Sequence, residues 1–154
     1  MSSAIAVFGE KRIKGVVRFT EKNDGKIRIN VKLFGLKKNG EHGFHIHEYG
    51  DMSDKCESMC LHFNPYNKKH GCPGKKQRHV GDLGNIITDE NGNANYEFED
   101  DVIKLHGKNN IIGRGLIIHR DRDDCGEGDN EQSKITGNAG KRIACAVIGY
   151  AKPE

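Results

Sequence analysis

The sequence lacks tryptophan, and aromatic residues make up only 6% of its 154 positions. Single-stranded nucleic acid is usually bound on stacked aromatic side chains, so nucleic acid is not an expected partner. No run approaches the roughly 18 apolar residues of a membrane span, and residues 1–7 lack the basic and apolar regions of a signal peptide. These absences predict no membrane partner and a cytoplasmic protein, or one in the host cytoplasm if a virus encodes it.

A strong excess of one charge is lacking too, because 25 Lys and Arg against 22 Asp and Glu leave a net charge of +3. Hydrophobic residues account for 34% and charged residues for 31%, which predicts one compact domain over residues 1–154 with a heavily charged surface. The 20 glycines favour tight turns over long helices.

Short alternating segments dominate the pattern, and Asp24-Gly25 is a strong hairpin turn between two of them. Two polar stretches, 48–81 and 120–141, interrupt the alternation, and loops of that length are usually functional. The sequence therefore predicts an all-β fold of eight antiparallel strands, a sandwich or barrel with two long functional loops. Strands are expected at residues 4–8, 15–20, 26–34, 43–47, 82–88, 94–98, 116–119 and 142–150.

Histidines form the most informative group, since six of the eight accompany one aspartate in a metal-ligand pattern. His45 and His47 are two apart on a predicted strand, so their side chains point the same way. Imidazole suits copper and zinc. A closed structural zinc site can be built from His70, His79 and Asp82 with a fourth histidine. A four-imidazole copper site can be built from His45, His47, His119 and a shared His62.

Four longer motifs contain most of these residues: GFHIHEYGD at 43–51, HFNP at 62–65, RHVGDLGN at 78–85 and GNAGKRIAC at 137–145. Together they resemble the copper/zinc superoxide dismutases over nearly the whole chain. The resemblance implies a Greek-key arrangement of the eight strands. It implies copper ligands at His45, His47, His62 and His119. It implies zinc ligands at His62, His70, His79 and Asp82, with His62 bridging the two metals.

The resemblance also implies the reaction, in which two superoxide anions and two protons become dioxygen and hydrogen peroxide while copper is reduced and reoxidised. His62 would leave copper on reduction and carry a proton, and Arg142 would hold the anion beside the metal. Asp123 would link a copper histidine to a zinc histidine and so orient both rings. Cys56 and Cys145 would form a disulfide.

Family resemblance extends to assembly. A homodimer is expected, with its interface near residues 49–51, 112–113 and 148–150, and a copper chaperone is a candidate partner for metal loading. Tyr150 stands where an aliphatic residue is typical, so the interface is expected to be repacked.

The chain departs from the family pattern in one loop and in its cysteines. Gln132, Lys134 and Ile135 change the charges near the expected anion path, which predicts an altered salt dependence of the rate. The remaining cysteines, Cys60, Cys72 and Cys125, are interpreted as tolerated small side chains. Alternatively, Cys60 competes with Cys56 for Cys145, because it is only four residues away.

Two other classes of function remain open. One is a metal-binding module without turnover, such as a copper buffer, a decoy or a chaperone-like domain. The other is a zinc-stabilised β-sandwich that serves as an interaction domain. The complete ligand set and Arg142 favour the enzyme, since relatives without activity usually lack one of them.

Overall fold

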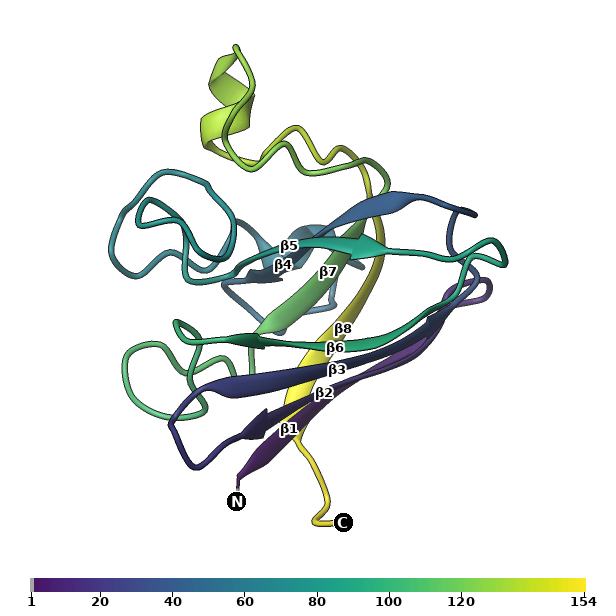
Figure 1. Cartoon of the computed structure of the whole chain (residues 1–154), viewed down its shortest axis with the longest axis vertical. Coiled ribbons are helices and arrows are strands. Elements are labelled where there is room, and N and C mark those ends of the chain that lie inside the picture. The colour runs from purple at the N-terminus through teal and green to yellow at the C-terminus, as the bar shows by residue number, and fades with distance from the viewer. Residues whose placement is uncertain (1) are drawn as a thin grey trace.

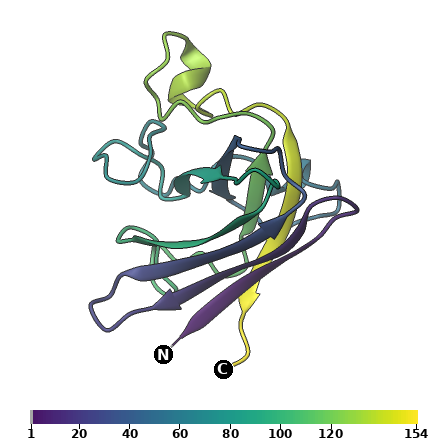
Figure 2. The ribbon, with the colours of Figure 1, turned by 45° about the vertical axis from the view of Figure 1, so that its right-hand side comes forward.

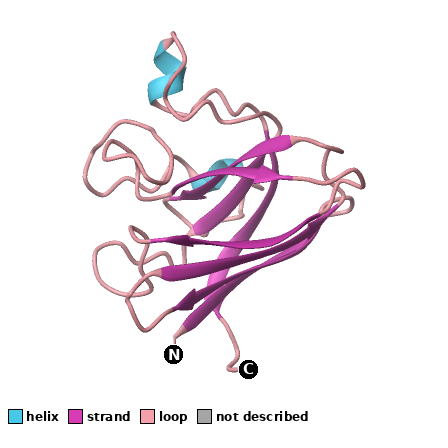
Figure 3. Ribbon diagram, in the orientation of Figure 1, coloured by secondary structure: helices cyan, strands magenta, loops and turns pink. Residues whose placement is uncertain are grey.

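The computed structural model describes residues 2–154, so Met1 of the predicted N-terminal segment lies outside the described part. Eight strands fall close to the eight predicted segments, which confirms the all-β prediction. They are β1 (Ser3–Gly9), β2 (Lys14–Glu21), β3 (Ile27–Phe34), β4 (Glu41–His47), β5 (Asp82–Ile87), β6 (Ala94–Asp100), β7 (Gly115–His119) and β8 (Arg142–Tyr150). Two short 3₁₀ helices, η1 (Glu57–Met59) and η2 (Glu131–Lys134), lie in the long loops (Figure 3).

The strands form one antiparallel sheet in the order β5-β4-β7-β8-β1-β2-β3-β6, and it curls into a nearly closed barrel (Figure 1). Strand β8 holds the two halves together, because residues 142–147 pair with β7 and residues 148–150 pair with β1 (Figure 2). Pairing of β3 with β6 and of β4 with β7 skips over intervening strands, as in a Greek key.

Alternation along β3 shows why the barrel forms. Ile27, Ile29, Val31 and Leu33 are fully buried, while Arg28 and Lys32 are exposed. A side-chain period of two places every second residue in the core. The same rule applied to β4 sends Phe44 and Ile46 into the core and leaves the two histidines on the opposite face.

The two long loops gather on one side of the barrel, above and beside β4 and β5 (Figures 1 and 3). Backbone hydrogen bonds fix the first loop along β4: Glu48 N donates to Leu61 O at 2.9 Å, and Phe63 N donates to Ile46 O at 2.8 Å. These bonds place His62 opposite His47 as an isolated bridge. Among residues 2–154, no helix has the length and apolar character needed to cross a membrane.

Candidate metal centre

Four histidines converge on the outer face of the barrel that the long loops cover. His45 and His47 come from β4, His119 ends β7, and His62 comes from the first loop. Each offers one ring nitrogen, and these four nitrogens lie within 4.8 Å of one another. All four side chains are buried. We call this group the imidazole set.

Backbone carbonyls orient two of these rings. His47 Nδ1 donates to Cys60 O at 2.8 Å, and His119 Nδ1 donates to Gly140 O at 2.9 Å. A carbonyl oxygen can only accept, so the proton must reside on Nδ1 in both rings. The lone pair is then on Nε2, and each Nε2 points toward the other histidines.

Asp123 orients a third ring and connects it to a second cluster. His45 Nε2 donates to Asp123 Oδ2 at 2.6 Å, and His70 Nε2 donates to Asp123 Oδ1 at 2.7 Å. Gly137 makes room for this bridge, because a Cβ atom there would lie 2.0 Å from Asp123 Oδ1. Asn85 fixes the aspartate backbone, accepting from Asp123 N at 2.7 Å and donating to Asp123 O at 3.0 Å.

One carboxylate is the centre of the second cluster. Asp82 Oδ1 lies 3.0 Å from the Nδ1 atoms of both His62 and His70, and 3.3 Å from His79 Nδ1. Asp82 Oδ2 accepts from the backbone of Gly71 at 2.9 Å and of His79 at 2.7 Å. We call His62, His70, His79 and Asp82 the aspartate set.

A grouping by mutual ligand distance joins His45, rather than His79, to His62, His70 and Asp82. His45 has only Nδ1 left to bind a metal, because its Nε2 is bonded to Asp123, and His45 already belongs to the imidazole set. His79 Nδ1, by contrast, lies 3.1 Å from His62 Nδ1 and faces the shared oxygen of Asp82. The aspartate set therefore includes His79.

Unpartnered nitrogens show that both sets suit a metal ion. A buried polar atom without a partner is rare and costly, and here five occur together. They are His45 Nδ1, His47 Nε2, His62 Nε2, His70 Nδ1 and His119 Nε2. One cation in each set would satisfy all of them. Imidazole donors alone suit copper, and three imidazoles with one carboxylate suit a closed zinc site.

Protonation states agree with metal binding. Burial lowers the pKa of His45 and His119 to about 4 and that of His62 to about 3, so these rings are neutral at pH 7. Burial also opposes the charge on His70, but the hydrogen bond with Asp123 and the nearby carboxylate of Asp82 outweigh it and raise its pKa to about 9. A metal cation would replace that proton. Despite burial, hydrogen bonds from the surrounding histidines hold the pKa of Asp82 far below its usual value.

Arg142 lies at the mouth of the imidazole set. Its Nη1 donates to Cys56 O at 2.9 Å and its Nη2 to Cys60 O at 2.6 Å. The guanidinium lines a cavity of about 690 Å³ into which His47 and His119 also open. This cavity is cationic, since Lys68, Lys69 and Lys134 contribute to its wall.

Cysteine pairing agrees with one expectation and overturns another. Cys56 is bonded to Cys145, as the resemblance implied, and Cys60 is free and exposed. Interpreting Cys72 and Cys125 as tolerated small side chains is wrong, because they form a second disulfide with a Cα–Cα distance of 5.0 Å. The two loops cross beside Asp123 and bring these cysteines together. Once Cys56 and Cys145 are paired, Cys60 and Cys72 remain in the first loop and Cys125 in the second, and these leftover cysteines were the signal that could have indicated a second bond.

The structure thus places every predicted ligand in one of two adjoining sets, with Asp123 between them and Arg142 at the entrance. Sequence reasoning missed three contributors: Asn85, which fixes Asp123; Gly137, which leaves room for it; and the bond between Cys72 and Cys125. Asn85 and Gly137 lay inside recognised motifs, but nothing in their local pattern indicated these contacts.

Comparisons with known proteins agree with this geometry. A family model described as copper/zinc superoxide dismutase matches residues 13–148. A superoxide dismutase [Cu-Zn] of Paramecium bursaria Chlorella virus 1 is 59% identical over 97% of this chain and 79% of its own length. One from Saccharomyces cerevisiae is 47% identical over 97% of this chain and 98% of its own. The crystal structure of the clock protein EA4 superposes with a TM-score of 0.94 at 47% identity, covering 97% of this chain and 94% of that one.

Proposed function

Because this chain belongs to the copper/zinc superoxide dismutase family, we propose that its two buried sets bind the two metals of that family. The imidazole set, His45, His47, His62 and His119, binds copper. The aspartate set, His62, His70, His79 and Asp82, binds zinc. The observation that carries this assignment is the convergence of unpartnered, buried imidazole nitrogens on two neighbouring points.

The protein is an oxidoreductase that converts two superoxide anions and two protons to dioxygen and hydrogen peroxide. Copper supplies the redox chemistry when bound, accepting an electron from one superoxide and giving it to the next. Arg142 holds the anion at the mouth of the cavity, since its guanidinium stays charged and is fixed by two carbonyls. When its Nε2 is not bound to copper, His62 would hold a proton on that atom for transfer to the reduced anion, while Nδ1 stays in the aspartate set.

Metal analysis and an activity measurement on one sample test the proposal. The purified protein, reloaded with copper and zinc, is expected to hold one of each per chain and to accelerate superoxide loss. A fully loaded protein that binds both metals without turnover would instead be a metal-binding module. A protein that takes zinc but no copper would be a zinc-stabilised β-sandwich.

Asp123→Asn is expected to weaken zinc binding by about 10- to 100-fold, the usual effect of removing a partner that orients a metal ligand. The asparagine amide has one acceptor oxygen, so it can accept from His45 or from His70. It cannot accept a charge-assisted bond from each of the two rings, as the carboxylate does. Chelator competition on the metal-free protein measures the effect. Asp121→Asn is the matched control, because Asp121 pairs with Arg120 at the surface. Equal zinc affinity in the unaltered chain, Asp123→Asn and Asp121→Asn would show that Asp123 does not support the zinc ligands.

Lys134 is the candidate steering residue for superoxide. Its ammonium is bonded to Gly126 O, and the side chain lines the cavity that leads to the imidazole set. Lys134→Ala is expected to lower kcat/KM roughly two- to fivefold at low ionic strength and to have little effect at high salt, where the Debye length is short. Stopped-flow rates at several salt concentrations measure this. An unchanged rate at low salt would show that Lys134 does not steer the anion.

We also propose that the protein is a homodimer, paired through an apolar patch of Val7, Met52 and Val147. These side chains are 60%, 46% and 40% exposed and line one shallow cavity. Gly50 lies under the patch, where an added Cβ would meet Gly113 O at 2.3 Å and Val147 Cγ1 at 2.9 Å. Within the expected 148–150 region, Ile148 points into the core and Tyr150 is exposed, so the outward aliphatic side chain of this strand is Val147, one residue before the region. A second copy of the chain is the partner that this patch fits.

Val147→Glu is expected to weaken the dimer by roughly 100-fold or more, because a two-fold interface would bury the unpaired carboxylate twice. Analytical ultracentrifugation over a concentration series measures the dissociation constant. Ile87→Glu is the control, since Ile87 is 60% exposed on β5 and outside the patch. A Val147→Glu protein that dimerises like the unaltered chain would place the interface elsewhere.

The proposal also covers the domain organisation of the chain, its compartment and a partner for copper loading. Residues 1–154 form one dismutase domain, supported by the single eight-stranded sheet. The protein acts in the cytoplasm, or in the host cytoplasm if a virus encodes it. A copper chaperone is a candidate partner, because all four imidazole-set side chains are buried.

A further inference from the structure

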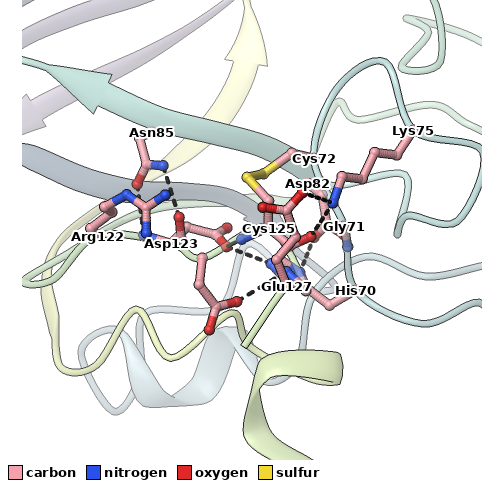
Figure 4. The surroundings of a disulfide bond; sticks show 12 residues. His70, Gly71, Cys72, Lys75, Asp82, Asn85, Arg122, Asp123, Cys125 and Glu127 are labelled. Atoms are coloured by element: carbon pink, nitrogen blue, oxygen red, sulfur yellow. Dashed lines mark hydrogen bonds and ion pairs between the residues drawn. A yellow bond between two sulfur atoms is a disulfide. The ribbon is translucent and has the colours of Figure 1, made fainter. Parts of the chain in front are cut away.

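The disulfide between Cys72 and Cys125 joins the two long loops beside the aspartate set (Figure 4). Cys72 belongs to the loop 48–81, and Cys125 belongs to the loop 120–141, 53 residues away in sequence. Apart from this bond, the two loops meet through hydrogen bonds and packing. The function proposed above makes no use of this second disulfide.

On the Cys125 side, the disulfide acts through Asp123. Cys125 N donates to Asp123 Oδ1 at 2.8 Å, the same oxygen that accepts from His70 Nε2 at 2.7 Å. Cys125 has a φ of +60°, in the left-handed region that residues other than glycine rarely adopt. This turn aims the amide at the carboxylate, and an outside constraint is needed to keep it.

On the Cys72 side, the disulfide acts through the neighbouring backbone. Gly71 N, one residue earlier, donates to Asp82 Oδ2 at 2.9 Å. His70 N, one residue further back, donates to Lys134 O in the other loop at 2.8 Å. Cys125 is therefore bonded directly to Asp123, and Cys72 follows the residue that is bonded to Asp82; both carboxylates lie against His70.

A salt bridge reinforces the same junction. Lys75 Nζ donates to Cys125 O at 2.9 Å and lies 2.9 Å from Glu127 Oε1, so it is a further link between the loops (Figure 4). This pair is partly exposed, and exposed ion pairs contribute little alone. The covalent bond is therefore the main constraint on the junction.

We propose that the Cys72–Cys125 disulfide is a positioning bond that assembles the aspartate set before zinc arrives and so raises the affinity for zinc. This inference rests on the proposed assignment of zinc to that set. A metal site formed by two mobile loops must be ordered at a cost when the ion binds, and that cost weakens binding. Joining the loops beforehand removes part of the cost, because His70 and Asp123 are already in contact.

Comparison of zinc affinities tests the proposal, using the metal-free chain and its Cys72→Ser/Cys125→Ser double variant. Both proteins keep the Cys56–Cys145 bond, which peptide mapping without reduction verifies. Chelator competition is expected to show about 10- to 100-fold weaker zinc binding in the double variant, the range seen when a ligand loses its support. Cys60→Ser, which removes the free thiol and no bond, is the matched control and should bind zinc like the unaltered chain.

Hydrogen exchange on the same metal-free samples separates positioning from general stabilisation. Faster exchange confined to residues 120–127 and 70–75 accompanies the affinity loss if the bond positions the site. Faster exchange throughout the barrel with unchanged zinc affinity would overturn the proposal, as would no difference in either measurement. If the serine pair does not fold, Cys72→Ala/Cys125→Ala supplies the same comparison.

His70→Ala distinguishes failure of this inference from failure of the zinc assignment. If His70→Ala binds zinc as tightly as the unaltered chain, zinc does not bind to the aspartate set and the proposed function is wrong on that point. If His70→Ala binds weakly while the double serine variant binds normally, the assignment stands and only the positioning role is overturned.

Discussion

His62→Ala should lower superoxide turnover by about 10²- to 10⁴-fold, the usual contribution of a positioned proton donor. No other side chain belongs to both sets: its Nε2 is unpartnered in the imidazole set, while its Nδ1 lies 3.0 Å from Asp82 Oδ1. Alanine removes both nitrogens together. Each metal loses a ligand, and the anion loses its proton source.

Rates and metal contents of the same samples decide this prediction. Stopped-flow decay of superoxide gives the turnover, and elemental analysis gives copper and zinc per chain. Copper and zinc affinities are both expected to fall in His62→Ala, whereas His119→Ala should reduce copper affinity alone. His106→Ala is the control, because His106 is exposed and pairs only with Glu21 at 3.1 Å. If His62→Ala keeps both metal affinities, the shared-ligand assignment is wrong.

The barrel could be predicted from the sequence because each strand shows its own alternation of apolar and polar residues. In β3, four buried aliphatic residues alternate with polar ones, and that pattern alone determines which face is covered. The His45 and His47 pair follows the same logic on β4. Sequence resemblance then partitioned the other ligands, and the structure brings their side chains close together on one face of the barrel.

Contacts between the two loops could not be predicted in the same way. The bridge from Asp123 to His45 and His70 joins residues that are 78 and 53 positions apart, and without the resemblance Asp123 would be assigned to an acidic surface loop. Cys72 and Cys125 meet only because both loops fold over the same carboxylates. No periodic pattern encodes such a crossing, so the sequence alone does not predict the bond between these two cysteines.

Arg142→Ala tests whether the site turns over superoxide or only stores metal. Its guanidinium is outside both ligand sets, so copper and zinc contents should not change. Loss of the fixed cation at the cavity mouth should lower kcat/KM by about 10- to 10³-fold. This is the range by which charged clefts raise association rates, and dismutases of this family are a known example of such steering. Stopped-flow rates at low and high salt measure both the loss and a flatter salt dependence.

Arg142→Lys and Arg120→Ala show whether position or charge accounts for that loss. Lysine keeps the charge but cannot donate to Cys56 O and Cys60 O with a rigid fork, so an intermediate rate is expected. Arg120→Ala removes a cation that pairs with Asp121 in the same loop and should leave the rate nearly unchanged. An Arg142→Ala protein with full metal content and an unaltered rate would mean that the anion is held elsewhere. Equal losses in Arg142→Ala and Arg120→Ala would reduce the role of Arg142 to net charge alone.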